Sequence, residues 1–241
     1  MLSHKLYSVS CSVILRLAEE IRETLVRVPY RLPEGSSVSI KSLLESLLPL
    51  HVGAKPINRE IKDFCLCCAA LASAERSESP SVYWIPKALS LLARSAMREI
   101  SAAGSFIAEH EMIAELMYEV LPELKEVVKE TCVDPDNEEF LAASARAPVA
   151  NAIVAAHQFR WLVAQVTYPH LGIMCSLVVP CALTALDHWS PEVKEQGMLA
   201  IIHLGNNVTA AELGWYEEAI LDVCCHNIAA TDELWSRVVE V

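Results

Sequence analysis

Hydrophobic and polar residues follow the period of α-helices along nearly the whole chain, and no stretch shows convincing strand alternation. Apolar residues recur three and four positions apart, and turns rich in Pro, Gly, Asp and Asn separate the periodic segments. The pattern predicts an all-α chain with a single domain over 1–241. The expected helices span 8–27, 38–48, 57–76, 81–99, 105–131, 138–167, 171–187, 191–205 and 210–228.

The clearest HEAT-like unit of this pattern lies over 171–228, and its first two helices form a hairpin. Ser190 is the expected N-cap of the second helix, and Pro191 takes its first position, where a missing N–H costs no hydrogen bond. Gly197 falls on the apolar face, where the absence of a side chain permits close approach of a neighbouring helix. Thr209–Glu212 has the spacing of a capping box. Because such a hairpin cannot bury its apolar face alone, the sequence predicts a HEAT/armadillo-like α-solenoid of stacked antiparallel hairpins.

Composition and charge narrow the class of partner. Apolar residues make up 53% of the chain, and the net charge is −12. Nucleic acids and anionic membranes attract proteins through Lys and Arg, so we expect neither as a partner. The longest apolar run, 171–186, contains Pro180 and is shorter than the ~20 residues of a membrane-spanning helix. No signal-peptide ending follows the first apolar segment, and we expect a cytoplasmic or nuclear protein.

Catalytic motifs are absent from the sequence. There is no nucleophile elbow, phosphate loop or dinucleotide fingerprint. His110 and Glu111 begin like a zinc-protease helix, but the second histidine of that motif is missing. We therefore expect no enzymatic activity, no cofactor and no bound metal, and we expect the scattered histidines to be surface or hydrogen-bonded core residues.

Nine cysteines raise one alternative. Cys65, Cys67 and Cys68 contain a Cys-x-x-Cys spacing, and Cys224-Cys225-His226 could complete a zinc site or a redox pair. Both groups fall inside apolar helical patterns rather than in loops. Buried, reduced, structural thiols are therefore the favoured interpretation, with a metal or redox protein as the alternative.

Aromatic residues near the clearest unit are candidate anchors for a partner protein. Trp189 lies in the turn between its two helices, and Trp215 is next to Tyr216 on the last predicted helix. Large aromatic side chains often dominate protein interfaces. Ordinary packing within the repeat is the alternative for all three.

One region of the chain carries a family resemblance. In it, Asn207-Val208 is followed by Ala-Glu-Leu and a tyrosine, which is more specific than a generic HEAT repeat. The residues that carry the resemblance are Pro180, Ala182-Leu183-Thr184, Asp187, Ser190, Lys194, Gly197, His203, Asn207, Val208, Ala211, Glu212, Leu213 and Tyr216. With them, the region 180–226 resembles the second Tel-two-interacting protein family, the smaller HEAT-like subunit of the TTT co-chaperone complex.

The resemblance implies a non-enzymatic scaffold. Members of that family bind the large HEAT-repeat subunit of the complex and, together with the Tel-two protein, help heat-shock chaperones mature phosphatidylinositol-kinase-related kinases. The chain stops soon after the motif region where relatives continue, so we expect it to be a shortened form. An unrelated HEAT or armadillo adaptor stays open as an alternative.

Overall fold

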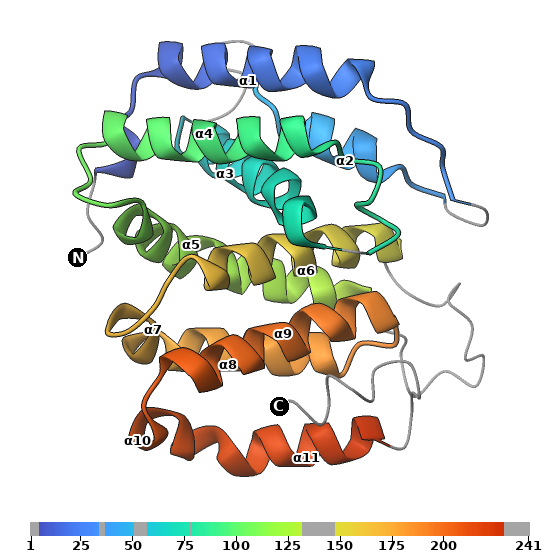
Figure 1. Cartoon of the computed structure of the whole chain (residues 1–241), viewed down its shortest axis with the longest axis vertical. Helices are drawn as coiled ribbons and strands as arrows, with labels where there is room; N and C mark the ends of the chain where they lie inside the picture. Colours follow the sequence, from blue (N-terminus) through green and yellow to red (C-terminus); the bar gives the residue numbers. More distant parts are fainter. Residues whose placement is uncertain (1–4, 34–36, 51–56, 78, 132–147, 229–241) are drawn as a thin grey trace. The chain divides into compact units, whose positions relative to one another are not determined.

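The computed structural model describes residues 5–33, 37–50, 57–77, 79–131 and 148–228 (Figure 1). Within these ranges the chain forms helices and turns and no β-strand, which confirms the all-α prediction for them. None of the helices found there has the length and hydropathy needed to cross a membrane.

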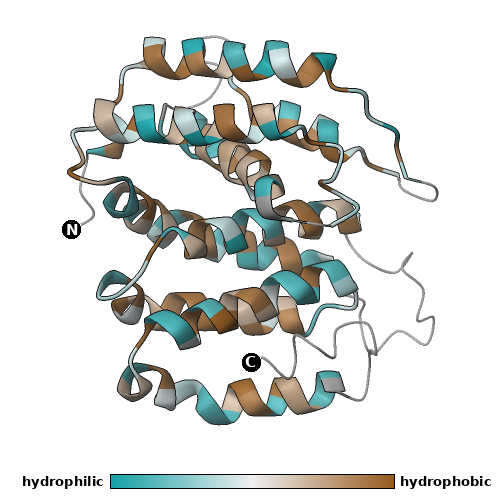
Figure 2. Cartoon of the chain, viewed as in Figure 1, coloured by the Kyte–Doolittle hydropathy of each residue, from teal (hydrophilic) through white to brown (hydrophobic). Residues whose placement is uncertain are grey.

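The chain divides into two compact units, Met1–Met117 and Tyr118–Val241. The first unit is built on a hairpin of α3 and α4, against which α1 packs. The buried side chains of Phe64, Leu71 and Met97 contribute to its core. In Figure 2, polar and hydrophobic residues alternate along α1, as expected of a helix with one buried face. The elements of this unit are η1 (Leu6–Ser8), α1 (Cys11–Arg27), α2 (Ile40–Ser46), α3 (Ile57–Ser73), η2 (Ala74–Arg76), α4 (Lys87–Ala103) and the start of α5 (Glu109–Glu130).

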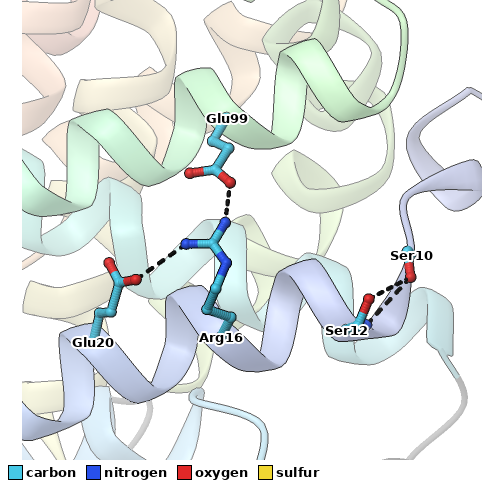
Figure 3. A network of polar contacts seen from close by, with 5 residues as sticks. All are labelled: Ser10, Ser12, Arg16, Glu20 and Glu99. Carbon is cyan, nitrogen blue, oxygen red and sulfur yellow. Dashed lines mark hydrogen bonds and ion pairs between the residues drawn. The ribbon is translucent and has the colours of Figure 1, made fainter.

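Polar contacts set the start and the register of α1 (Figure 3). Ser10 is the N-cap, and its hydroxyl oxygen accepts a hydrogen bond from the backbone N–H of Ser12 at 3.4 Å. Farther along, Arg16 pairs with Glu20 of α1 at 3.0 Å and with Glu99 of α4. These side chains are about half exposed, so the pairs align α1 with α4 and add little stability.

The second unit is built around α9, which packs against both α6 and α8, while α8 also contacts α11. Figure 2 shows hydrophobic residues along most of α8, and buried residues occur on nearly every side of α6. Helices with this character need neighbours on more than one side. The elements are the rest of α5, α6 (Val149–Ala164), α7 (His170–Ile173), α8 (Cys175–Leu186), α9 (Pro191–Asn207), α10 (Ala210–Leu213), η4 (Gly214–Tyr216) and α11 (Glu217–Ile228).

The helix start predicted at residue 81 is wrong. The helix expected over 81–99 begins only at Lys87, and the residues before it form turns. Pro86 is its N-cap, and a proline disfavours helical backbone at the residue that precedes it. The apolar pattern alone carries no information about this effect of proline on the preceding residue.

Two helices predicted in the second unit are interrupted. The one expected over 171–187 breaks at Met174, between α7 and α8. The one expected over 210–228 is divided by η4, which begins at the poor helix former Gly214. The first part of the helix predicted over 138–167 lies outside the described residues, and its described part is α6.

Candidate functional site

The α8–α9 hairpin carries several of the residues singled out in the sequence, and Gly197 sets the distance between its two helices. A Cβ atom at Gly197 would lie 2.9 Å from the carbonyl oxygen of Ala182 and 3.1 Å from the Cβ of Ala185. Both neighbours belong to α8, so only glycine lets the two helices approach this closely. The predicted close approach at Gly197 is confirmed.

The start of α9 is where the sequence placed it. Ser190 is the N-cap and Pro191 the first helical residue, as predicted. The Ser190 hydroxyl makes no capping hydrogen bond. The Ser190 carbonyl accepts the first helical hydrogen bond, from the N–H of Lys194 at 3.1 Å, and the Ser190 N–H donates to Nδ1 of His188 at 3.0 Å.

His188 is buried in the turn and bonded through both ring nitrogens. Since Nδ1 accepts from Ser190, the ring hydrogen lies on Nε2 and is donated to the Thr131 hydroxyl oxygen at 2.8 Å. Thr131 in turn donates to the carbonyl of Val128 at 2.7 Å. Burial, helped by the charge of Lys194, lowers the pKa of His188 to about 4, so the imidazole is neutral at pH 7.

Trp189 belongs to the same turn cluster. Its indole N–H donates to the backbone carbonyl of Thr131 at 2.9 Å, and its ring stacks beside His188 with centroids 5.5 Å apart. The side chain is still 40% exposed. These contacts favour packing within the chain for Trp189, the alternative that the sequence left open.

Lys194 and Asn227 tie α11 to the hairpin. The Lys194 ammonium donates to the side-chain oxygen of Asn227 at 2.6 Å, and the Asn227 amide donates to the carbonyl of Leu186 at 3.3 Å. Burial lowers the pKa of Lys194, while the charge of Asp187, at the C-cap of α8, raises it. Asn227 was not singled out in the sequence, because nothing local marks its partners on two other helices.

Pro180 lies inside α8 rather than at its start. A proline there removes one backbone hydrogen bond of the helix. The Thr184 hydroxyl donates to the carbonyl of Pro180 at 2.8 Å. Both residues of this resemblance motif therefore make local contacts within α8.

The C-terminal end of α9 is fixed by His203. Its Nε2 donates to the carbonyl of Val166 at 2.9 Å, which links α9 to the end of α6. Asn207 donates to the backbone carbonyl of His203 at 2.9 Å, and Val208 is the extended C-cap residue. Burial lowers the pKa of His203 despite the bond to Val166.

The predicted capping box at the start of α10 is confirmed. The Thr209 hydroxyl accepts from the Glu212 N–H at 3.4 Å, and the Glu212 carboxylate accepts from the Thr209 N–H at 3.1 Å. The same carboxylate occupies the space where Gly172 of α7 would carry a Cβ. The half-buried Leu213 closes α10. These contacts dock α10 against α7.

A buried contact between α6 and α9 was missed in the sequence. The Nε2 of His157 lies 3.2 Å from a carboxylate oxygen of Glu192, in the first turn of α9. The histidine is only 1% exposed. The two residues are 35 positions apart, and no local pattern connects them.

The three predicted partner-binding aromatics are not brought together. Trp189 precedes α9 and Trp215 follows α10, so the length of α9, roughly 25 Å for a helix of its size, separates their positions. Trp215 is 89% exposed, whereas Tyr216 is half-buried. Trp215 is therefore the stronger candidate for an interface anchor.

The cysteine cluster of α3 lacks the features of a reactive site. Cys65, Cys67 and Cys68 are fully buried, and burial raises the pKa of Cys65 to about 12 and that of the other two further. Thiols in this state are not nucleophiles or ready metal ligands at neutral pH. Across the described ranges, no three His, Cys, Asp or Glu side chains converge as metal ligands would.

Comparison with known proteins finds a relative in a plant. The chain is 46% identical over 244 residues to the uncharacterized protein At2g39910 of Arabidopsis thaliana, and the match covers 95% of the chain. The chain spans 56% of that relative's length. No protein-family model matches. No solved structure matches either.

Proposed function

We propose that this chain is a non-enzymatic scaffold, an α-solenoid of stacked hairpins that binds other proteins along its surface. By its resemblance, we infer the role of the smaller HEAT-like subunit of the TTT co-chaperone complex. In that role it binds the large HEAT-repeat subunit and the Tel-two protein in the cytoplasm or nucleus. It thereby supports chaperone-assisted maturation of phosphatidylinositol-kinase-related kinases.

The proposal is supported by the contacts of the residues that carry the family resemblance, because these residues connect neighbouring helices. Gly197 spaces α8 from α9, Lys194 reaches α11 through Asn227, and His203 links α9 to α6. Such contacts between helices hold them in register, and a repeat unit requires helices in a fixed register. The arrangement supports a scaffold whose recurrent residues serve packing, with recognition left to exposed side chains such as Trp215.

The cysteine alternative receives no support from the thiol environments. The raised pKa values in α3 oppose thiolate chemistry. Cys224, in α11, is buried, and burial also raises its pKa. A binding role therefore fits these residues better than a redox role does.

Affinity purification of the tagged chain from cells, followed by mass spectrometry, tests the proposal. We expect the large HEAT-repeat subunit and the Tel-two protein among the recovered proteins. Trp215→Ala combined with Tyr216→Ala should reduce their recovery while circular dichroism stays unchanged. Tyr83→Ala, which removes an 80% exposed aromatic ring from the first unit, is the matched control. Recovery of a different HEAT-binding assembly would decide for the unrelated adaptor.

A further inference from the structure

The segment from η4 through α11 presents one exposed stripe. Its positions are spaced three and four residues apart, so they lie along one side of the helix. Leu221, beside the stripe, is 56% exposed. We call this surface the α11 outer face. It consists of Trp215, Glu218, Ala219, Asp222, Cys225 and His226, all exposed.

The sequence around the α11 outer face is poor in basic residues. From 161 to 236 the sequence contains a single Lys or Arg, Lys194, and its ammonium is bonded to Asn227 on the inner side of α11. Glu217, Glu218 and Asp222 are exposed. Only Asp222 has a basic neighbour in its helix, His226 at 3.7 Å. The face therefore combines the exposed Trp215 side chain with the exposed carboxylates of Glu218 and Asp222.

We propose that the α11 outer face binds a basic amphipathic helix of a partner protein. Trp215 would contact the apolar stripe of that helix, and Glu218 and Asp222 would contact its Lys and Arg side chains. The face covers about three helical turns, roughly 18 Å, which matches anchors at positions i, i+3 or i+4 and i+7 of the bound helix. The proposal rests on the chain being a binding scaffold and specifies the chemistry of one partner segment.

Charge favours a basic helix at this face over a second copy of the chain and over the chain's own segment 229–241. A second copy of the chain would bring its own net charge of −12 against the acidic face. The segment 229–241 carries Asp232, Glu233 and Glu240 against a single Arg237, so it is also acidic. Like charges across an interface oppose association, whereas a basic helix is attracted and oriented by the same field.

A labelled peptide provides the probe. It is a designed 14-residue helix with Leu at one-turn spacing and Lys elsewhere, and its counterpart carries Glu in place of Lys. Anisotropy titrations with the full chain should show the Lys peptide binding at least tenfold more tightly than the Glu peptide. Trp215→Ala, and separately Glu218→Lys with Asp222→Lys, should each weaken binding of the Lys peptide at least tenfold.

Matched controls separate this site from general acidity. Tyr83→Ala removes a comparably exposed ring, and Glu23→Lys with Glu130→Lys makes the same change in net charge at exposed positions elsewhere. Each control should alter the dissociation constant less than twofold. If the controls weaken binding as much as the α11 variants, attraction is nonspecific and the proposal is wrong.

Two further results would show that something other than a partner's basic helix binds the α11 outer face. If ending the chain at Ile228 tightens peptide binding tenfold, the chain's own C-terminal segment occupies the face. If sedimentation equilibrium shows a dimer that Trp215→Ala dissociates, a second copy does. If the peptide binds as expected but the TTT subunits are not recovered from cells, the assignment to the TTT complex is wrong and the peptide site remains. If the TTT subunits are recovered but the peptide does not bind as expected, only the peptide site is wrong.

Discussion

The close approach of α9 to α8 at Gly197 predicts that two glycine-to-alanine changes in one helix will have opposite effects. Alanine is a better helix former than glycine by ~1 kcal/mol, so each change brings a similar gain in propensity. At Gly205, a Cβ would meet nothing within 4 Å, and the gain is retained. At Gly197, the added atom would meet the Ala182 carbonyl at 2.9 Å and the Leu186 nitrogen at 3.1 Å. Those are backbone atoms of α8, which cannot rotate away.

Overpacking of this kind costs ~1–3 kcal/mol, which exceeds the propensity gain. We expect Gly197→Ala to lower the free energy of unfolding by about 1 kcal/mol and Gly205→Ala to raise it by up to ~1 kcal/mol. For a protein of this size, ~1 kcal/mol corresponds to a shift in melting temperature of ~2–4 °C. Urea denaturation followed by circular dichroism at 222 nm measures both variants. Equal stabilisation by the two changes would refute the close packing of α8 on α9.

Three other predictions concern the second unit. Ile201→Asp buries an unpaired carboxylate at a position only 3% exposed and should cost more than ~3 kcal/mol, whereas Ile202→Asp, at a half-buried position, should cost much less when both are measured by urea denaturation. The pKa of His188 is about 4 in the folded chain against 6.5 unfolded, so the unfolded state binds more protons between these values. The contribution of His188 to stability is complete above pH 6.5 and is lost as the pH falls toward 4, and the loss is on the order of 2 kcal/mol. The free energy of unfolding of His188→Gln should therefore fall less than that of the wild type between these pH values. Parallel pH profiles of the two proteins would contradict the lowered pKa of His188. Trp189→Phe removes the hydrogen bond to Thr131 and should lower stability by ~1 kcal/mol, whereas Trp215→Ala should leave the melting temperature unchanged.

The features that the sequence predicted correctly are local ones. Capping by Thr209 and Glu212 depends on residues three positions apart, and Pro191 starts a helix through its own fixed dihedral angle. The close contact at Gly197 was predictable because a glycine inside a helix costs stability, and a neighbouring helix that needs the space compensates for that cost. The start of α4 was misplaced because apolar periodicity outweighed the restriction that Pro86 imposes on the residue before it.

Only part of the candidate site could be predicted from local sequence patterns. Trp189 and Trp215 looked equivalent in the sequence, yet one is bonded to Thr131 and the other is 89% exposed. Asn227 carried no signal at all, because its role depends on Lys194 and Leu186 from other helices. Exposure and partnership of a side chain are set by what packs against it.

By itself, the sequence determined that the described part of the chain is helical, where helices such as α9 and α10 begin, and that the chain carries an excess of negative charge. Those properties follow from periodicity, capping and composition, which act over a few residues or over the chain as a sum. The tertiary structure decided that His188 is neutral and buried, that Lys194 is directed to Asn227, and that Trp215 is exposed beside acidic residues. Each of these depends on contacts between residues far apart in the chain, and only folding brings such residues within hydrogen-bonding distance.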